Sequence, residues 1–394
     1  MSDNPSFVLR AVEDVVYEQR PIPEISGDQV LVEVKKTGAQ PRRYLLDDNP
    51  EYGSHTGICG SDVHYLVEGR IGDFIVNNPM VLGHESAGIV SKVGPDVKHL
   101  KVGDRVAMEP GATCRKCDAC KSGRYELCPD IVFAATPPYD GTLGRYYRLP
   151  ADLAFPLPDN VSLEDGAMIE PLAVGIHSVS NLGGFRANQA IIIFGCGPVG
   201  LLCMSVAKAL GASRIIAVDI NVARLEFAKS YAATDAYLPP KMEEGEARAA
   251  YSRRNAEKMK LDLGIEDRGS KAIDLVIDAS GAEVSIQTAL YVAKSGGTVV
   301  QVGMGNPNVT IDIGQLTTKE LNYKGSFRYG PGDYPLAIAL VAQGKIDLKP
   351  LVTHRYTFDQ AIAAFQATRA GKSEDGKGVI KAIISGPDFS ADAA

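Results

Sequence analysis

The feature that most constrains the fold is a glycine-rich turn between an apolar run and a helical stretch. The pattern consists of an apolar run at 190–194, the glycines Gly195, Gly197 and Gly200, a helical stretch at 201–210, a second apolar run at 215–218 and Asp219. G-x-G-x-x-G spacing is weak evidence alone, but between a strand and a helix, with an acidic residue after the next strand, it is typical of a dinucleotide-binding Rossmann unit.

The chemistry of such a turn favours NAD. Without side chains the backbone can approach a pyrophosphate, whose charge is met by the N–H groups at the helix start. Asp219 can accept both ribose hydroxyls and would repel the additional phosphate of NADP, so we expect NAD rather than NADP. A glycine turn without a ligand is the alternative. The candidate cofactor residues are Gly195, Gly197, Pro198, Val199, Gly200, Asp219, Arg224, Val302 and Gly303.

The pattern of apolar runs along the chain predicts one domain interrupted by another. Apolar runs at 273–278 and 298–302, with a helical segment between them, extend the alternation into a doubly wound parallel sheet. Before it, from 7 to 106, glycine and proline punctuate short apolar runs that read as antiparallel strands. We therefore expect an α/β protein in which a Rossmann domain, 173–317, is inserted into a β-rich domain made of 1–172 and 318–394.

Composition narrows the function classes. A length of 394 residues excludes a single small module, and a net charge of −7 argues against binding nucleic acid or an anionic membrane through a basic surface. No apolar run approaches the roughly 20 residues of a membrane span, and the start MSDNPSFVLR lacks the features of a signal peptide. We expect a cytoplasmic protein that acts on a small molecule.

Cysteine spacing points to a structural metal site. Four of the seven cysteines, Cys114, Cys117, Cys120 and Cys128, crowd into fifteen positions. Four thiolates close a tetrahedral shell around zinc and leave no open position, so such a site contributes to folding rather than to catalysis. An iron–sulfur cluster is an alternative because Cys128 is followed by Pro129, although the final gap differs from that of bacterial clusters. Free or disulfide-bonded thiols are the other alternative.

A second metal site is suggested by Cys59 and by His84, which is followed by Glu85. A lone cysteine or histidine more often packs than ligates, and spacing cannot establish that the two meet. Both residues occur in a chain with a dinucleotide-binding domain, and this favours a catalytic zinc. Hydride transfer from an alcohol needs loss of the hydroxyl proton, which zinc promotes. The histidines without a motif are interpreted as structural: His55, His99, His177 and His354.

The order of these motifs resembles that of the zinc-dependent medium-chain alcohol dehydrogenases over essentially the whole length. Within them the chain is most similar to the polyol branch, which includes sorbitol dehydrogenases and, closest of all, the fungal xylitol dehydrogenases (D-xylulose reductases). The stretches that carry the resemblance are Gly57-Ile-Cys-Gly-Ser-Asp-Val-His-Tyr65, the GHE at 83–85, Phe133-Ala-Ala-Thr-Pro-Pro-Tyr-Asp-Gly141, Ile169-Glu-Pro-Leu-Ala-Val174 and Lys324-Gly-Ser-Phe-Arg-Tyr329.

The resemblance implies a chaperonin-10-like β-rich catalytic domain and a catalytic zinc bound by Cys59 and His84. Glu170, or Glu85 in some states, would complete the shell, and Asp62 would orient His84. It also implies that Ser61 passes the substrate's hydroxyl proton toward solvent. His64 is either a proton relay or a surface residue.

The implied substrate pocket is lined by Tyr65, Phe133, Glu170, Arg328 and Tyr329. For the three aromatic residues, core packing is the alternative. The implied reaction is NAD-dependent oxidation of a polyol, with xylitol to D-xylulose favoured over sorbitol or L-arabinitol, in a homo-oligomer. A zinc-free quinone or enoyl reductase on the same fold is disfavoured because both ligand candidates are present.

The chain departs from the family beside a ligand. In the family the strand ending at Gly38 runs directly into Ile58-Cys59, whereas here residues 39–57 intervene. The insertion must loop out so that Thr56-Gly57 replaces Thr37-Gly38. A segment that disrupted the zinc loop would instead leave an inactive NAD-binding homologue.

Overall fold

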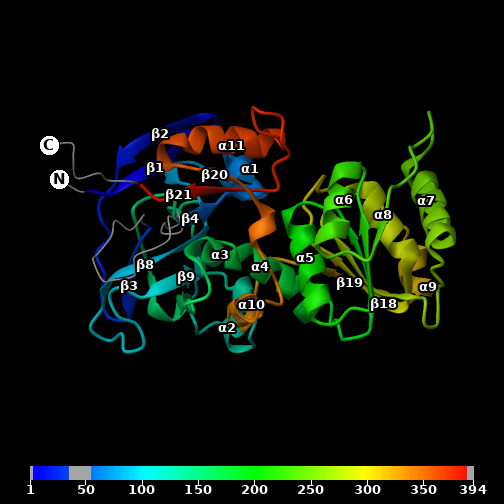
Figure 1. Ribbon diagram of the computed structural model, residues 1–394, viewed down its shortest axis with the longest axis horizontal. Helices are drawn as coiled ribbons and strands as arrows, with labels where there is room; N and C mark the ends of the chain where they lie inside the picture. Colours follow the sequence, from blue (N-terminus) through cyan, green and yellow to red (C-terminus); the bar gives the residue numbers. More distant parts are fainter. Residues whose placement is uncertain (1–2, 35–54, 388–394) are drawn as a thin grey trace, which may run out of the picture. The chain divides into compact units, whose positions relative to one another are not determined.

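Two compact units make up the protein. The computed structural model describes residues 3–34 and 55–387, and one unit is formed by Met1–Glu170 with Ala337–Ala394, the other by Pro171–Leu336 (Figure 1). The two boundaries fall within helices α4 (Ile169–Ile176) and α10 (Asp333–Ala342). The second unit is therefore an insertion into the first.

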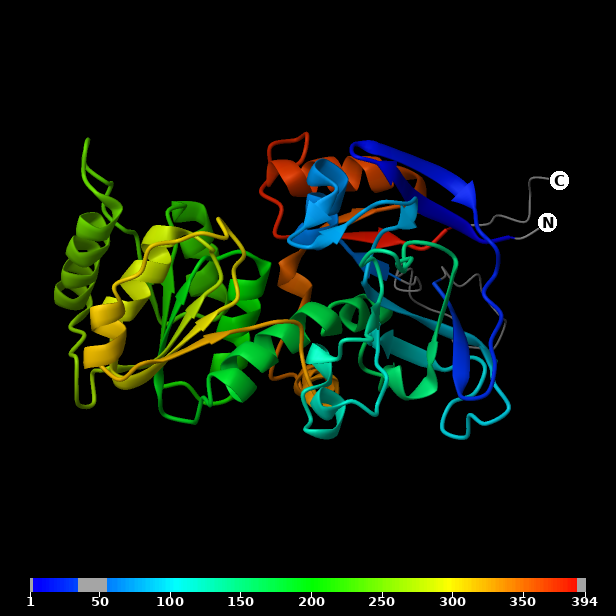
Figure 2. The same cartoon turned by 180° about the vertical axis from the view of Figure 1, so that it is seen from behind.

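The second unit is built on a six-stranded sheet of order β16-β15-β14-β17-β18-β19, with all pairs parallel. Its strands are β14 (Ala190–Phe194), β15 (Arg214–Val218), β16 (Asp235–Tyr237), β17 (Ile273–Asp278), β18 (Ala293–Gln301) and β19 (Asn322–Gly325). Its helices, beside α4, are α5 (Pro198–Ala209), α6 (Val222–Tyr231), α7 (Arg248–Leu263), α8 (Glu283–Val292) and α9 (Ile313–Thr318). Figure 2 shows the same strands from behind.

This sheet is the expected doubly wound Rossmann arrangement. Every residue of β14 is buried, as expected for a central parallel strand covered on both faces. The expected end of the domain at 317 precedes β19, whose register with β18 keeps the chain in this sheet as far as Gly325. The second unit consequently continues to Leu336.

The first unit is rich in short, mostly antiparallel strands. The main sheet has the order β12-β3-β8-β4-β21-β20, with β9 paired to β8 and β13 paired to β9. Its strands are β3 (Gln29–Glu33), β4 (His55–Gly57), β8 (Glu85–Val93), β9 (Arg105–Met108), β12 (Tyr146–Pro150), β13 (Ala154–Pro156), β20 (Val352–Tyr356) and β21 (Lys381–Ser385).

Smaller sheets and helices complete this unit. The remaining strands are β1 (Pro5–Ala11), β2 (Asp14–Gln19), β5 (Arg70–Ile71), β6 (Phe74–Ile75), β7 (Met80–Val81), β10 (Gly111–Ala112) and β11 (Val132–Phe133). The helices are α1 (Gly60–Glu68), α2 (Asp118–Lys121), α3 (Leu163–Ala167) and α11 (Ala361–Ala370). A buried cluster that includes Phe7, Leu82 and Phe365 packs strands of both sheets against α11. Within the described ranges, no helix is long and apolar enough to cross a membrane.

Strand β4 leads directly into the candidate metal loop. Thr56 pairs with Ser86 on β8, and Gly57 lies opposite Glu85. A Cβ on Gly57 would lie 2.1 Å from the Glu85 carboxylate, so any other residue here would displace that carboxylate. Thr56-Gly57 thus enters the sheet immediately before Ile58-Cys59, whereas Thr37-Gly38 and the insertion up to residue 54 lie outside the described residues.

The local structure does not require glycine equally at the three glycine positions after β14. Gly195 has φ +92°, which favours glycine, and a Cβ on Gly200 would lie 1.9 Å from the Gly195 carbonyl oxygen. Gly197 has φ −78° and no atom of the described chain within 4 Å of its Cβ position. Folding therefore requires glycine at 195 and 200 but not at 197.

We predict that Gly200→Ala destabilises the protein by about 1–3 kcal/mol, the usual cost of overpacking a tight site. Gly197→Ala is the matched control and should leave stability unchanged, because its methyl group meets open space. The measurement is the urea midpoint of unfolding for both variants. Equal losses would show that the turn packs differently.

Candidate metal and cofactor sites

The structure brings Cys59, His84 and Glu85 together in the first unit. One potential ligand atom of each lies within 4.8 Å of the others. Cys59 is the N-cap residue of α1, Glu85 is the first residue of β8, and His84 immediately precedes it. The sheet makes this convergence possible because β4, which precedes Cys59, pairs with β8.

Asp62 fixes the ring of His84. Its carboxylate is fully buried, lies 3.5 Å from His84 Nδ1 and accepts the backbone N–H of Gly83 at 3.0 Å. This contact occupies Nδ1 and leaves Nε2 as the nitrogen able to bind a metal. Although burial raises the pKa of Asp62, the charge and hydrogen bond of His84 lower it overall. Burial lowers the pKa of His84, but Asp62 and Cys59 together raise it well above its ordinary value.

Glu85 is held by a residue that sequence reasoning missed. Lys381 on β21 donates to Glu85 Oε1 at 2.5 Å and to the Ile58 carbonyl at 3.2 Å, and both charged side chains are almost fully buried. Burial alone would lower the pKa of Lys381, but Glu85, Cys59 and Glu170 raise it. A lone lysine in a C-terminal strand carries no motif, so no sequence signal marks it.

The two carboxylates that the sequence left open are placed differently. Glu85 belongs to the ligand cluster, whereas Glu170, buried in the first turn of α4, is outside it among the described residues. Lys381 engages both oxygens of Glu85, through the hydrogen bond to Oε1 and an ion pair with the buried Oε2. The donor set of a thiol, an imidazole and a carboxylate, with one potential ligand atom of each within 4.8 Å of the others, fits a bound zinc ion.

Other residues of this loop take several positions. Ser61 is half-buried in the first turn of α1, and His64, one turn further on, is exposed and contacts Glu68 at 3.2 Å. Tyr65 is buried in the hydrophobic cluster around Ile58. The ring of Phe133 is buried 6.0 Å from the ring of His84.

The four-cysteine lobe forms a second cluster in the same unit. Its Sγ atoms all lie within 4.8 Å of one another. Backbone N–H groups donate to the sulfurs: Cys117 to Cys114 at 3.3 Å and Cys114 to Cys128 at 3.4 Å. Backbone donors at Lys116 and Cys117 lower the pKa of Cys114 to about 7. This compact arrangement fits one tetrahedral ion.

In the second unit the turn after β14 is tied to Asp219. One oxygen of Asp219 accepts the N–H of Cys196 at 2.8 Å, and the other accepts the N–H of Asn221 at 2.8 Å. Pro198 and Val199 open α5, and Arg224 stands exposed in the first turn of α6.

Val302 and Gly303 are organised by a residue that carried no motif. Both donate their N–H groups to the Asp278 carbonyl at 2.8 Å. The Asp278 carboxylate accepts from Gly281 N–H at 2.9 Å and Gln301 Nε2 at 2.6 Å, and burial raises its pKa. Asp278 thereby holds together the loops that follow β17 and β18. The only sequence signal was its position at the end of an apolar run.

Arg328 and Tyr329 also belong to the second unit. Arg328 has φ +57°, which is unusual for a residue with a side chain, and its guanidinium lies 4.5 Å from the centre of the Phe327 ring. Tyr329 is buried edge-to-face against Tyr334, with ring centres 5.2 Å apart.

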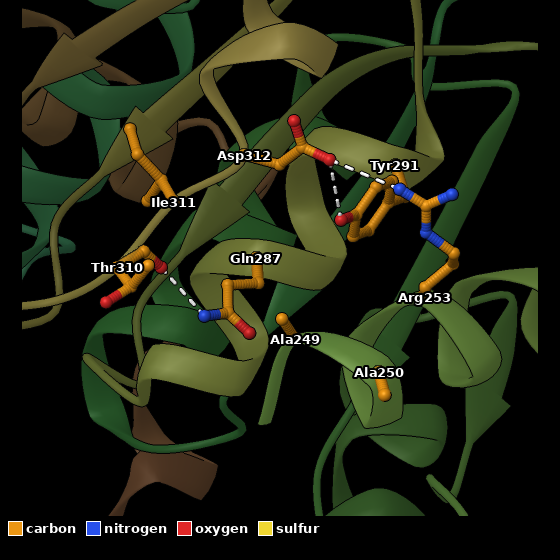
Figure 3. A pocket seen from close by; sticks show the side chains of 8 residues that line it. All are labelled: Ala249, Ala250, Arg253, Gln287, Tyr291, Thr310, Ile311 and Asp312. Carbon is orange, nitrogen blue, oxygen red and sulfur yellow. Dashed lines mark hydrogen bonds and ion pairs between the residues drawn. The ribbon is translucent and has the colours of Figure 1, made fainter. Parts of the chain in front are cut away.

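A separate surface pocket of about 410 Å³ lies over α7 and α8 (Figure 3). Its polar side chains satisfy one another: Arg253 contacts Asp312 at 3.3 Å, and Gln287 donates to the Thr310 carbonyl at 2.7 Å. None of the candidate residues named above lines it. We therefore assign no role in the site to this pocket.

Comparison with known proteins decides the family. Residues 54–159 match the alcohol dehydrogenase GroES-like domain, and residues 198–343 match the zinc-binding dehydrogenase domain. D-xylulose reductase A of Aspergillus niger is 50% identical over 98% of both chains, and a probable D-xylulose reductase A of Aspergillus fumigatus is 49% identical over 98% of this chain and 97% of its own. The chain belongs to the zinc-binding alcohol dehydrogenase family. The expected family and fold class are confirmed.

Several solved structures share the whole fold. L-idonate 5-dehydrogenase from Escherichia coli is 27% identical with a TM-score of 0.79, covering 97% of this chain and 98% of its own. An Escherichia coli oxidoreductase of unknown specificity is 31% identical with a TM-score of 0.80, covering 98% and 99%. An alcohol dehydrogenase from the same species, solved with NADH, is 25% identical with a TM-score of 0.80, covering 97% and 99%.

We predict that Lys381→Met destabilises this zinc-binding dehydrogenase by about 3–5 kcal/mol, because it leaves the Glu85 carboxylate buried without its partner. Adding Glu85→Gln removes the unpaired charge and should recover most of the loss. Urea unfolding of the single variants and the double variant, all with a chelator present, measures the coupling. Additive losses would contradict a buried ion pair.

Proposed function

We propose that this enzyme oxidises a secondary hydroxyl of a polyol to a ketone with NAD, and that it converts xylitol to D-xylulose. The observation that carries the proposal is the convergence of Cys59, His84 and Glu85 in a ligand cluster. The names of relatives about half identical over nearly the full length support xylitol as the substrate. The remaining steps follow from the residues around that cluster.

Cys59, His84 and Glu85 would hold a catalytic zinc, and the four cysteines of the lobe would hold a structural one. Bound zinc supplies Lewis acidity, which favours the ionised form of an alcohol hydroxyl. Three protein ligands leave a fourth position open, as catalytic zinc sites require, whereas four thiolates close the shell. Of the two carboxylates, we propose Glu85 as the third ligand because it lies in the cluster and Glu170 does not.

The chain's own groups manage the substrate's proton. Asp62 holds His84 by Nδ1 and so keeps the ring oriented toward Cys59. Ser61 Oγ, in the same first turn of α1 as Asp62, would accept the hydroxyl proton and pass its own to solvent. Glu170, the other candidate catalytic residue, would accept a hydrogen bond from a second hydroxyl of the polyol.

The second unit would bind the dinucleotide. The open space beside Gly197 and the N–H groups of the first turn of α5, which have no intrahelical acceptor, suit a pyrophosphate, and Asp219 would bind the ribose hydroxyls. Bound NAD would supply the hydride acceptor, so that loss of a proton and of a hydride from the carbinol would together give the ketone. Phe133, Arg328 and Tyr329 would contact the polyol, whereas the burial of Tyr65 favours a packing role.

Two alternatives keep the same fold. Sorbitol or L-arabinitol could be preferred over xylitol, since the choice depends on one hydroxyl's stereochemistry. An NAD-binding homologue without catalysis would need the 39–57 insertion to disrupt the zinc loop, but the ordered entry of β4 into the sheet disfavours this. The proposal also includes three further statements. The substrate is a small-molecule polyol, with no nucleic acid or membrane partner. The protein is cytoplasmic and forms a homo-oligomer.

We expect the purified protein to produce NADH from xylitol at a higher kcat/KM than from sorbitol or L-arabinitol. A chelator should abolish the signal, and added zinc should restore it. The measurement is absorbance at the NADH band over a polyol panel. Lack of any polyol-dependent signal in the zinc-loaded protein would sink the proposal.

Metal stoichiometry separates the two clusters. We predict about two zinc ions per chain, because the described residues contain two ligand clusters. Cys59→Ser should retain about one and lose activity by roughly 10³-fold, since Lewis acidity contributes several kcal/mol. Cys203→Ser is the control: this buried thiol belongs to neither cluster, so both ions should remain. Retention of both ions by Cys59→Ser would contradict the assignment.

Gly197→Ala tests the cofactor assignment. The added methyl group should weaken NADH binding by at least about tenfold, because it occupies the approach of the pyrophosphate, while unfolding stability stays unchanged. Fluorescence titration with NADH measures the affinity. An unchanged dissociation constant would place the dinucleotide elsewhere.

A further inference from the structure

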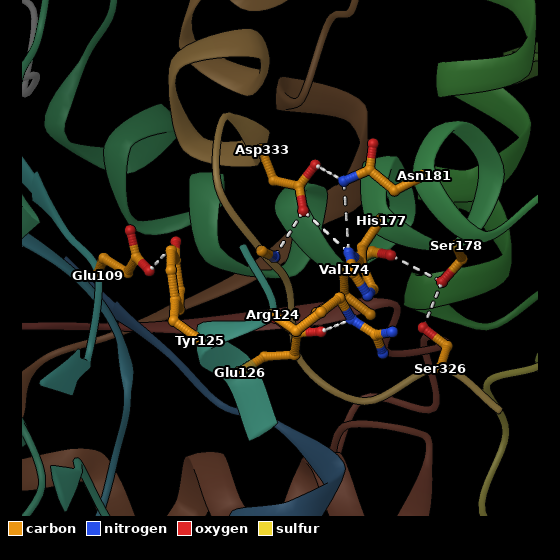
Figure 4. A network of polar contacts seen from close by, with 11 residues as sticks. Glu109, Arg124, Tyr125, Glu126, Val174, His177, Ser178, Asn181, Ser326 and Asp333 are labelled. Carbon is orange, nitrogen blue, oxygen red and sulfur yellow. Dashed lines mark hydrogen bonds and ion pairs between the residues drawn. The ribbon is translucent and has the colours of Figure 1, made fainter. Parts of the chain in front are cut away.

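The helix that carries Glu170 ends in a π-helical turn, His177–Leu182. Such turns are rare and are frequent at functional sites. Three polar side chains of this turn, His177, Ser178 and Asn181, make contacts with the segment that carries Arg328 and Tyr329 (Figure 4). Neither His177 nor this turn was distinguished by any sequence motif.

Asp333 is the centre of the first contact. Its Oδ2 lies 3.1 Å from His177 Nδ1 and accepts the N–H of Gly330 at 2.7 Å, while its Oδ1 accepts from Asn181 Nδ2 at 2.8 Å. Asp333 and His177 are 2% and 4% exposed, so water has little access to the contact between their side chains. Because an ionised carboxylate only accepts, all three partners must be donors, which places the hydrogen of His177 on Nδ1.

Ser178 makes the second contact. Its hydroxyl donates to the Val174 carbonyl at 2.8 Å and lies 3.0 Å from the hydroxyl of Ser326. Ser326 also donates its backbone N–H to the Gln301 carbonyl at 2.8 Å. The loop is therefore fixed at Ser326 and again at Gly330, two residues before and two residues after Arg328.

Arg328 needs such support. Its φ of +57° is disfavoured for a residue with a Cβ and persists only where the surroundings impose it. The guanidinium of Arg328 lies over the Phe327 ring, and the next residue, Tyr329, is buried against Tyr334, so these contacts restrict the positions open to the Arg328 side chain. A donor held in place before the substrate arrives loses less entropy on binding.

We propose that Asp333, with His177, Asn181 and Ser178, is a positioning network that holds the 326–333 loop so that Arg328 is preorganised to bind polyol hydroxyls. This inference rests on the proposed function for the identity of the substrate. It goes beyond that function by naming residues that set polyol affinity without touching the polyol.

The test is Asp333→Asn. The amide offers only one accepting oxygen to three donors, so at least one bond is replaced by a donor facing a donor. We expect KM for xylitol to rise at least tenfold, with KM for NAD and the zinc content unchanged, and we expect faster hydrogen exchange across 326–332. Ser178→Ala removes the other anchor and should raise the same KM less, which keeps the inference testable if Asp333→Asn folds poorly.

Two comparisons separate positioning from general stability. In an Arg328→Ala background, Asp333→Asn should raise KM for xylitol by less than twofold, because it acts through Arg328. Asp235→Asn is the matched control. It removes a carboxylate on β16, an edge strand of the parallel sheet of the second unit, that accepts hydrogen bonds from Arg214. This change should lower stability without changing KM for xylitol.

The outcomes are distinct. If the unaltered enzyme oxidises polyols but Asp333→Asn changes neither KM for xylitol nor exchange across 326–332, the network has no positioning role. Full additivity with Arg328→Ala also overturns it. If the unaltered enzyme oxidises no polyol, the proposed function fails and with it the substrate half of this inference, while the exchange measurement still decides the anchoring half.

Discussion

The account depends on buried charges meeting at the end of one antiparallel sheet. A thiol, an imidazole and a carboxylate converge beside β4 and β8, and each of the last two is held by an opposite charge, Asp62 for His84 and Lys381 for Glu85. Isolated charges are too costly to bury, so such a group persists only when every member has a partner. The network fixes the geometry of the cluster before any ion arrives.

The strand pairing that forms this cluster uses the last residues of the 39–57 insertion. Gly57 lies opposite Glu85, where an added side chain would displace the Glu85 carboxylate, and Cys59 follows two residues later. The chain re-enters the sheet at β4 with this glycine in place. Thr56-Gly57 therefore supplies the Thr-Gly pair that precedes the metal loop. In the second unit the turn after β14 is likewise determined by neighbouring residues. Its backbone requires glycine at 195 and 200, whereas Gly197 faces open space where a ligand can bind.

Much of this could be predicted from the sequence because the decisive signals are short and local. The glycine spacing with Asp219, the four cysteines, and the apolar runs of the parallel sheet each lie within a few dozen residues, where spacing and periodicity carry information. The convergence of Cys59 with His84 needed the resemblance to a family, since spacing alone left it open. The pairing of Asp62 with His84 came from the same source.

What could not be predicted rests on contacts distant in sequence. Lys381 lies 296 positions from Glu85, and Asp333 lies 156 from His177, and neither pair has a local pattern. The predicted boundary at 317 comes before β19, which carries few apolar residues and gives little strand signal, although it pairs with β18. Tyr65 matched the motif of a pocket residue, yet the fold packs it in the core around Ile58.

Anomalous diffraction at the zinc edge from crystals of the zinc-loaded enzyme tests the central claim most directly. The account predicts a peak about 2.3 Å from Cys59 Sγ and about 2.1 Å from His84 Nε2, with a Glu85 oxygen in the same shell. A peak in the four-cysteine lobe with none between Cys59 and His84 would contradict it.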